Sequence, residues 1–122
     1  ASNPLDKAML DRAMAIIDQH YTDSRFSVDI FAREIGMSRT ALFTKWKTLT
    51  GQTPKEFIMN LRLRKAAREL RANRELSIAD ISYRNGFSSP RYFCKCFNDL
   101  YQQQPSTYRN ATRVDETDNY TE

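Results

Sequence analysis

Two cysteines and one histidine are the residues best suited to redox, metal or nucleophilic chemistry, and their spacing supports none of these. Cys94 and Cys96 are two residues apart, so on a helix they point to nearly opposite sides and cannot bridge each other. Together with the distant His20 they fall short of a four-ligand zinc site. No Gly-x-Ser-x-Gly, His-Glu-x-x-His or paired-carboxylate motif occurs. We therefore expect a non-enzyme without metal or cofactor, with reduced thiols in the cytoplasm.

Basic residues form the second chemical group, and they are concentrated in the middle of the chain. Residues 37–109 carry 14 basic and 5 acidic residues, whereas residues 1–36 have a net charge of −2 and residues 110–122 of −3. A concentrated basic block is typical of a protein that binds nucleic-acid phosphates, although a solvated helix surface looks similar. No apolar run approaches the roughly 18 residues of a membrane span, so no membrane contact is expected.

Seven helices follow from capping residues and from apolar residues at 3.6-residue spacing, which predicts an all-α fold. They are expected at about residues 4–20, 28–35, 39–49, 54–72, 78–85, 90–100 and 105–110. The side chains expected to cap their starts are Asn3, Ser27, Ser38, Ser77 and Ser89. Thr53 and Glu56 flank Pro54 in a capping box that opens the longest helix. A disordered acidic tail is expected over residues 111–122.

The inner faces of these helices should be apolar. The residues expected there are Met9, Ala13, Ile16, Ile17, His20, Val28, Phe31, Ala32, Ile35, Leu42, Trp46, Leu49, Phe57, Leu61, Leu63, Ala67, Leu70, Ile78, Ile81, Ser82, Phe93, Phe97 and Leu100. The helix at 54–72 also has a basic side, made of Arg62, Arg64, Lys65, Arg68 and Arg71. That side is expected to meet a partner or another domain rather than DNA along its whole length.

An internal repeat organises the chain. Residues 27–38 (SVDIFAREIGMS) match residues 77–88 (SIADISYRNGFS) at an offset of 50, and after one extra residue the offset becomes 51. Each copy is a short helix, a turn at glycine followed by an apolar residue (Met37 or Phe87), and a second helix. This is the layout of a helix-turn-helix, and two copies in register are far more specific than one.

The repeat predicts two helix-turn-helix subdomains, residues 1–52 and 74–110, joined by a connecting helix over residues 53–73. A connector of about 20 residues is about 30 Å long, close to the roughly 34 Å of one DNA turn. The two second helices are therefore expected to enter successive major grooves on one face of a duplex. They would recognise two segments about 10 bp apart.

From about Leu10 to Asn110 the sequence resembles the DNA-binding domain of the AraC/XylS family of bacterial transcription regulators. The residues that carry the resemblance are Ile78, Ile81, Gly86, Phe87, Tyr92, Phe93, Phe97, Pro105, Tyr108 and Arg109. The stretch MSRTALFTKWKTLTGQTPKEFI is most similar to the C-terminal output domains of hybrid two-component regulators of Bacteroides-type bacteria. The resemblance implies a seven-helix domain that binds promoters, contacts RNA polymerase and acts as an activator in the cytoplasm.

Four positions depart from the family pattern. Ser82 replaces the usual Ala and should still pack, whereas Gln102 replaces a usual Gly. Gln104 replaces the usual Ser or Thr cap of the last helix, which should start less firmly. Thr44 stands where two-component relatives often carry Arg, which weakens the case for a strong contact by the first subdomain.

The residues expected to touch DNA lie on the outward faces of the third and sixth helices. They are Arg39, Thr40, Phe43, Thr44 and Lys47 on the third, and Ser89, Pro90, Arg91, Tyr92 and Lys95 on the sixth. Arg39, Arg91 and Lys95 can donate to guanine or phosphate, and Thr40, Phe43 and Tyr92 can meet thymine methyl groups. Partial burial of Phe43 beside Trp46, and a packing role for Tyr92, are the alternatives.

Phosphate contacts are expected where helices begin, because the first N–H groups have no intrahelical acceptor. The candidates are Ser38, Lys55, Ser88 and Ser106. Arg109 is expected to reach either a phosphate or an internal carboxylate.

Two other functions remain open. One is a helical protein-interaction module that binds an acidic partner, and the other is the output domain of a ligand-binding activator of the same family. In either regulator, dimerisation is expected through domains outside this chain, because no coiled-coil seam is present.

Overall fold

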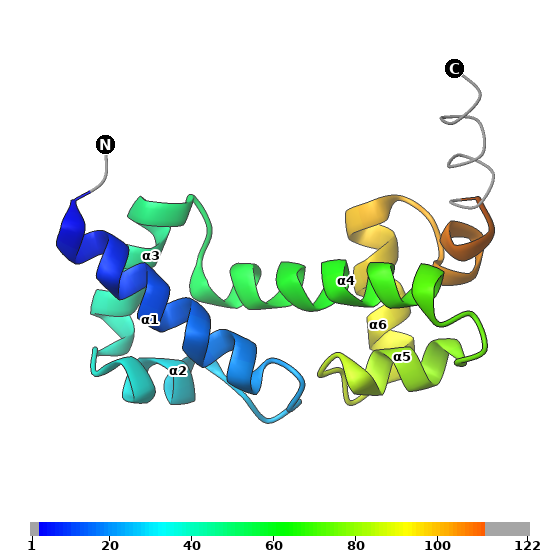
Figure 1. Cartoon of the computed structure of the whole chain (residues 1–122), viewed down its shortest axis with the longest axis horizontal. Coiled ribbons are helices and arrows are strands. Elements are labelled where there is room, and N and C mark those ends of the chain that lie inside the picture. The colour runs from blue at the N-terminus through cyan, green and yellow to red at the C-terminus, as the bar shows by residue number, and fades with distance from the viewer. Residues whose placement is uncertain (1–2, 112–122) are drawn as a thin grey trace, which may run out of the picture. The chain divides into compact units, whose positions relative to one another are not determined.

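The structure is a computed structural model that describes residues 3–111 of the 122-residue chain, and this part contains helices and no strand (Figure 1). The helices are α1 (Pro4–His20), α2 (Val28–Ile35), α3 (Arg39–Thr50), α4 (Pro54–Ala72), α5 (Ile78–Arg84) and α6 (Pro90–Tyr101). Residues 105–111 are helical as well. The all-α prediction and the seven helices are confirmed. Residues 112–122, where the acidic tail is expected, lie outside the described residues.

The chain divides into two compact units, with the boundary between Met59 and Asn60. The first unit contains α1, α2, α3 and the start of α4. The second contains the rest of α4, α5, α6 and the helical residues 105–111. Each unit is thus one copy of the repeat, and α4 is shared between them.

Side chains cap the helices as the sequence predicts. The Ser38 Oγ accepts from the Ala41 N–H at the start of α3 (3.1 Å). Thr53 and Glu56 form the expected capping box: each backbone N–H donates to the other side chain (2.9 and 3.1 Å), and this holds the pKa of Glu56 below its usual value. Ser89 caps α6 as expected, because its Oγ accepts from the Tyr92 N–H (3.1 Å).

The first unit packs around Trp46, which is fully buried on the inner face of α3. Its ring lies edge-on to Phe31 of α2 (centroids 5.5 Å apart) and to Phe57 of α4 (5.0 Å). The Arg12 guanidinium of α1 donates to the Ile35 carbonyl at the end of α2 (2.6 Å). Two helices, α2 and α4, thus pack against the buried ring of α3, and α1 is bonded to the end of α2.

The second unit repeats this arrangement around Phe97, which is fully buried on α6. Phe97 contacts Phe93 (centroids 5.6 Å apart), Tyr101 (4.5 Å) and Tyr108 (5.3 Å). Tyr108 occupies the repeat position of Phe57. Leu100 was expected to face inward and is exposed, because Tyr101 takes the inner place in the last turn of α6.

Glu69 of α4 is a hydrogen-bonding centre of the second unit. Its carboxylate accepts from the Arg84 Nε (2.8 Å), the Asn85 Nδ2 (2.8 Å) and the Asn73 Nδ2 (3.0 Å). Asn85 is buried, and its Nδ2 also donates to the Ile81 carbonyl (2.9 Å). Glu69 therefore ties α4 to the end of α5, directly before the turn that leads into α6.

The basic side of α4 is narrower than the sequence predicts. Arg62 is buried, together with its neighbours Leu61 and Leu63, so α4 is covered around most of its circumference there. Arg64 and Arg68 are exposed. The exposed basic side therefore begins at Arg64, two residues later than expected.

Two departures from the family pattern are accommodated differently. Ser82 is fully buried and packs as expected, with its hydroxyl donating to the Ala79 carbonyl (2.7 Å). Gln102 caps α6 with φ +60°, and no other non-glycine residue has a positive φ in the described part of the chain. Gly51 caps α3 at the equivalent repeat position with φ +79°. The second unit thus places a side chain where the first unit uses glycine.

Replacing Gln102 with glycine should stabilise the domain by about 0.5–1 kcal/mol, because a left-handed conformation strains a residue that has a Cβ. Loss of the exposed bond from the Gln102 Nε2 to the Asp99 carbonyl (2.9 Å) offsets part of the gain. The change is measured by thermal and urea unfolding. The matched control is Gly51→Gln, which should destabilise the domain by a similar amount. A lower melting temperature for Gln102→Gly would contradict this account of the cap.

Candidate nucleic-acid interface

The five residues predicted on the third helix lie together on the outer surface of α3. Leu42 and Trp46 are fully buried on its inner face. The exposed side chains are Arg39, Thr40, Phe43, Thr44 and Lys47. Positions 40, 43, 44 and 47 recur at three- and four-residue spacing, so they share one face of the helix. Phe43 is 50% exposed, so it is partly buried, as the alternative expects, and still presents half of its surface to solvent.

The residues predicted on the sixth helix are also brought together, at the start of α6. Phe93 and Phe97 are fully buried on the inner face, whereas Arg91, Tyr92 and Lys95 are exposed. The two residues that begin the helix, Ser89 and Pro90, are half-buried. Ser89 uses its hydroxyl oxygen as the N-cap, which leaves its proton to donate outward.

The charges on α6 suit a surface that meets anions. Lys95 bonds the Asp99 carboxylate (Nζ–Oδ2 3.2 Å), which raises the pKa of Lys95 and keeps it cationic. A hydrogen bond with the Cys96 thiol raises the pKa of the Tyr92 hydroxyl, so Tyr92 is a neutral phenol at pH 7. Burial raises the pKa of the Cys94 thiol, and both cysteines are free. At neutral pH this face carries two cations, Arg91 and Lys95, and a neutral donor.

Two of the three cations on α3 are paired with carboxylates of other helices. The Arg39 guanidinium bonds Asp29 at the start of α2 (NH1–Oδ1 3.2 Å), and both side chains are exposed. The Lys45 Nζ lies 2.7 Å from the Asp6 Oδ1 of α1. Sequence patterns missed both pairs because the acidic partners lie in other helices. Each outer surface thus has one cation paired with a carboxylate, Arg39 on α3 or Lys95 on α6, and a second exposed cation, Lys47 or Arg91.

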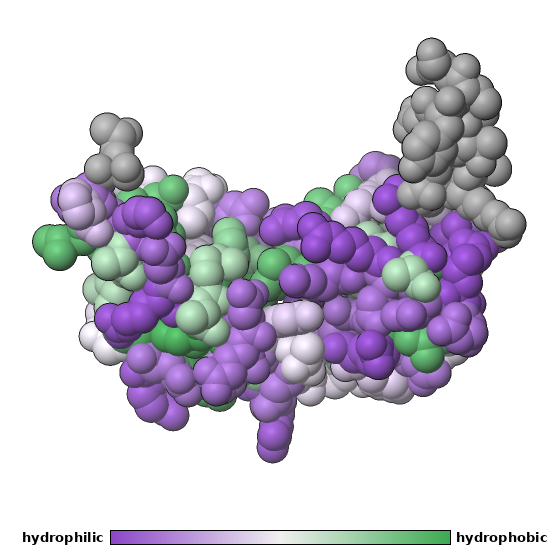
Figure 2. Space-filling model, in the orientation of Figure 1, coloured by the Kyte–Doolittle hydropathy of each residue, from purple (hydrophilic) through white to green (hydrophobic). Residues whose placement is uncertain are grey.

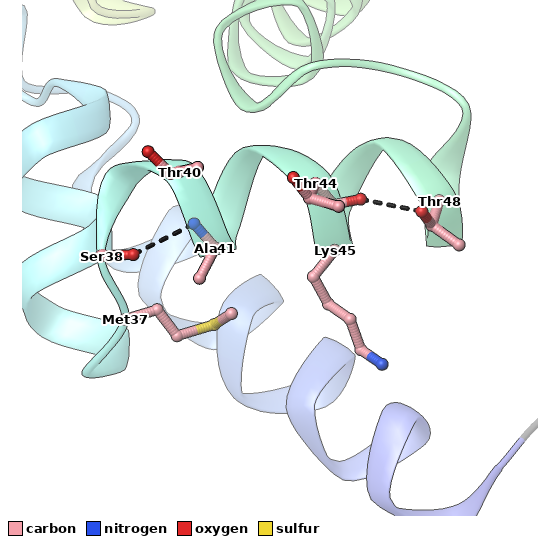
Figure 3. Close-up of a pocket in the computed structure, with 7 residues that line it drawn as sticks. All are labelled: Met37, Ser38, Thr40, Ala41, Thr44, Lys45 and Thr48. Atoms are coloured by element: carbon pink, nitrogen blue, oxygen red, sulfur yellow. Dashed lines mark hydrogen bonds between the residues drawn. The ribbon is translucent and has the colours of Figure 1, made fainter.

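A shallow depression flanks α3 on the side of α1 (Figure 3). It is lined by Met37, Ser38, Thr40, Ala41, Thr44, Lys45 and Thr48. The Thr48 hydroxyl donates to the Thr44 carbonyl (2.9 Å), and the Lys45 side chain points away from α3 toward α1 (Figure 3). This side of the helix is therefore mainly neutral and rich in hydroxyl groups.

Three of the predicted phosphate contacts lie where helices begin. Ser38 caps α3, Lys55 lies in the first turn of α4, and Ser106 lies in the first turn of residues 105–111. All three are exposed. Ser88 is exposed as well, but it precedes the cap of α6 by one residue. The residues at the start of α6 that can contact a phosphate are therefore Ser89 and Arg91.

Arg109 has an internal role, and its partners are carbonyls rather than a carboxylate. Its Nε donates to the Leu70 carbonyl (2.9 Å), and its NH2 group donates to the carbonyls of Asn73 (3.3 Å) and Leu76 (3.0 Å). A cation at the C-terminal end of α4 is stabilised by the helix dipole. Arg109 therefore stabilises the second unit and is not part of the interface.

Among residues 3–111 no group of three or more His, Cys, Asp or Glu side chains is placed to hold a metal ion. None of the described helices is both long and apolar enough to cross a membrane.

Comparison with known sequences identifies the family. A helix-turn-helix domain model matches residues 31–111. Over 106 residues the chain is 42% identical to Histidine kinase P4 of Formosa agariphila, a match that covers 87% of this chain and 8% of the kinase. The chain spans 36–38% of the length of the next curated relatives that it matches.

Solved structures agree with this assignment. The C-terminal domain of the two-component response regulator YesN from Fusobacterium nucleatum matches with a TM-score of 0.78 and 28% identity, over 81% of this chain and 95% of that one. The DNA-binding domain of AdpA, solved with a target DNA, matches with a TM-score of 0.80 and 28% identity, over 86% and 93%. The two units define a double helix-turn-helix DNA-binding domain. The chain belongs to the AraC family of transcription regulators, as the signature residues of its second half imply.

Neutralising Asp29 should strengthen DNA binding, because Asp29→Asn frees the Arg39 guanidinium and removes a negative charge beside α3. We expect an affinity gain of about 3–10-fold at low salt. The slope of log K against log salt should steepen by up to about one unit, as for one further phosphate contact. The measurement is a salt titration of duplex binding by fluorescence anisotropy.

The matched control for this titration is Asp11→Asn. Asp11 is an exposed carboxylate of α1 paired with Lys7 (3.0 Å), so the variant removes the same charge from a different helix. Equal gains for both variants would show a general effect of net charge and contradict the release of Arg39.

Proposed function

We propose that this chain is the output domain of a larger two-component regulator that activates transcription in the bacterial cytoplasm. In this proposal α3 and α6 each enter the major groove of a promoter, in successive turns of one duplex. Recruitment of RNA polymerase belongs to the same proposal, as does dimerisation through parts of the protein outside this chain.

One observation carries the proposal. In both copies of the repeat a buried aromatic residue, Trp46 or Phe97, holds the inner face of the second helix. The opposite face then presents exposed side chains that can hydrogen-bond or contact base edges. An exposed outer face on a rigidly held helix is what groove reading requires.

The assignment to a two-component protein is supported by the relatives. The chain is 42% identical to Histidine kinase P4, and the similar YesN domain is the C-terminal domain of a response regulator. This favours a phosphorylation-controlled protein over a ligand-binding activator of the same family.

Within the interface we assign roles by chemistry. The Arg91 guanidinium donates to a guanine, and Lys95 donates to guanine or phosphate. The N–H groups at the starts of α3, α4 and residues 105–111 hold phosphates, together with the exposed Ser38, Lys55 and Ser106. Thr40, Thr44 and Lys47 complete the surface of α3.

A protein-interaction module is the less supported function. Such a module needs a contiguous apolar surface on the outer faces of α3 and α6. These faces carry Arg, Thr and Lys with isolated aromatics. The described residues on the face shown in Figure 2 are likewise mostly hydrophilic, with apolar residues scattered among them.

Selection of duplexes from a random pool, followed by salt titration, tests the proposal. We expect an enriched sequence with two recognised segments about 10 bp apart, and affinity that falls steeply with salt. Arg91→Ala should cost about 1–3 kcal/mol on the selected duplex and relax specificity at one segment. The control is Arg25→Ala, which removes an exposed arginine of the α1–α2 loop. No enriched sequence would refute the proposal, and equal weakening on all duplexes would make Arg91 a phosphate contact.

A further inference from the structure

Phe43 is an exposed aromatic side chain on the DNA-facing surface of α3. It is 50% exposed, although Trp46, three residues later, is fully buried. Half of the Phe43 surface is open to solvent, although it lies among polar side chains. Its position is therefore better explained by an apolar group that it meets on binding.

The surroundings of Phe43 form a small apolar notch. A shallow depression between α2 and α3 is lined by Val28, Arg39, Thr40 and Phe43. Val28 was expected in the core, but it is half-buried and offers part of its side chain to this notch. The Thr40 methyl group and the Phe43 ring supply the α3 wall.

The charged residue at the edge of the notch is already paired with a carboxylate. Arg39 is the one charged residue of the lining, and it is held by Asp29 (3.2 Å). The notch thus offers apolar contact surface beside a paired guanidinium. Between Val28 and Phe43 such a surface discriminates bases by shape and apolar contact.

The thymine methyl group is the one apolar group on a base edge in the major groove. We propose that the notch of Val28, Thr40 and Phe43 reads thymine methyl groups, and that Phe43 determines specificity in the DNA segment bound by the first unit. This rests on the proposed function, because it takes α3 as a groove-reading helix. The notch is continuous with that surface, since Thr40 and Phe43 belong to both.

The second unit reads DNA by different chemistry. Its exposed side chains on α6 include Arg91 and Lys95, which recognise bases through hydrogen bonds. The two halves of the site therefore differ in one respect: the first has an apolar notch beside its polar side chains, whereas the exposed aromatic of the second, Tyr92, carries a hydroxyl group. A modification that changes only a methyl group distinguishes them.

The experiment replaces each thymine of the selected duplex by deoxyuridine, one position at a time. This removes the methyl group and leaves base pairing and every hydrogen-bonding group in place. We expect a loss of about 3–6-fold at one or two positions in the segment bound by the first unit, as for burial of one methyl group. Positions in the other segment should change less. No position in the first segment with a measurable loss would overturn the inference.

Protein variants link the effect to the notch. Phe43→Ala should weaken binding to the thymine duplex and bring the ratio of thymine to uracil affinity close to one, whereas Phe43→Leu should keep most of that ratio. Tyr83→Ala is the matched control, because Tyr83 is similarly exposed (53%) but lies on α5. Circular dichroism confirms that the variants fold, and the deoxyuridine scan on the unaltered protein needs no variant.

The outcomes separate this inference from the proposed function. Absence of any sequence preference would refute the proposed function itself. Selective binding in which Phe43→Ala leaves the thymine-to-uracil ratio unchanged would refute the methyl notch alone. Selective binding in which that ratio collapses for Phe43→Ala, and persists for Tyr83→Ala, supports both.

Discussion

The burial of one aromatic side chain on the inner face of each recognition helix is the constraint on which the interface depends. Trp46 in α3 and Phe97 in α6 are both fully buried, and each meets a ring three residues after a proline, Phe57 or Tyr108. A helix held at one large inner side chain cannot rotate about its axis without opening a cavity that costs about 3–5 kcal/mol. The rotation of each helix is thereby set, and with it the identity of the outward residues. The capping serines then set where each helix begins, and hence which N–H groups point outward.

The two units meet this constraint with different polar contacts. The first unit links its helices through separate pairs, such as Lys45 with Asp6 and His20 with Glu34. The second unit gathers several donors on one carboxylate, Glu69, and closes the end of α4 with the Arg109 guanidinium. The repeat therefore preserves the packing positions and lets the polar groups diverge. Packing alone is sufficient to define the helix orientation, so the surface of each copy is free to recognise a different DNA segment.

Local pattern was sufficient to predict the helices, their caps and most of their inner faces, because caps and 3.6-residue spacing are properties of neighbouring residues. For the same reason it predicted most of the exposed side chains of α3 and α6. It failed where a side chain bonds to or packs against a distant segment. Nothing near Glu69 or Arg109 in the sequence marks their partners, which lie up to 39 residues away. Arg62 was assigned to the exposed side by its charge, although three consecutive positions of α4 are buried there. Leu100 lost the inner place to Tyr101, a choice between adjacent apolar residues at a helix end that spacing alone does not resolve.

Exposed cations and the proposed methyl contact would act over different distances in binding. On the first unit, Arg39 and Lys45 are both held by carboxylates of other helices, so their attraction for phosphates is reduced. Lys47 and Lys55 of the first unit are exposed, as are Arg64, Arg68 and Arg91 of the second. Uncompensated cations act over about a Debye length and raise the rate of encounter with DNA at low salt. Contact with a methyl group acts only at van der Waals distance and is nearly independent of salt. Under the proposed function, the exposed cations of both units therefore provide attraction and steering, whereas the proposed methyl contact of the first unit acts at short range and depends on register.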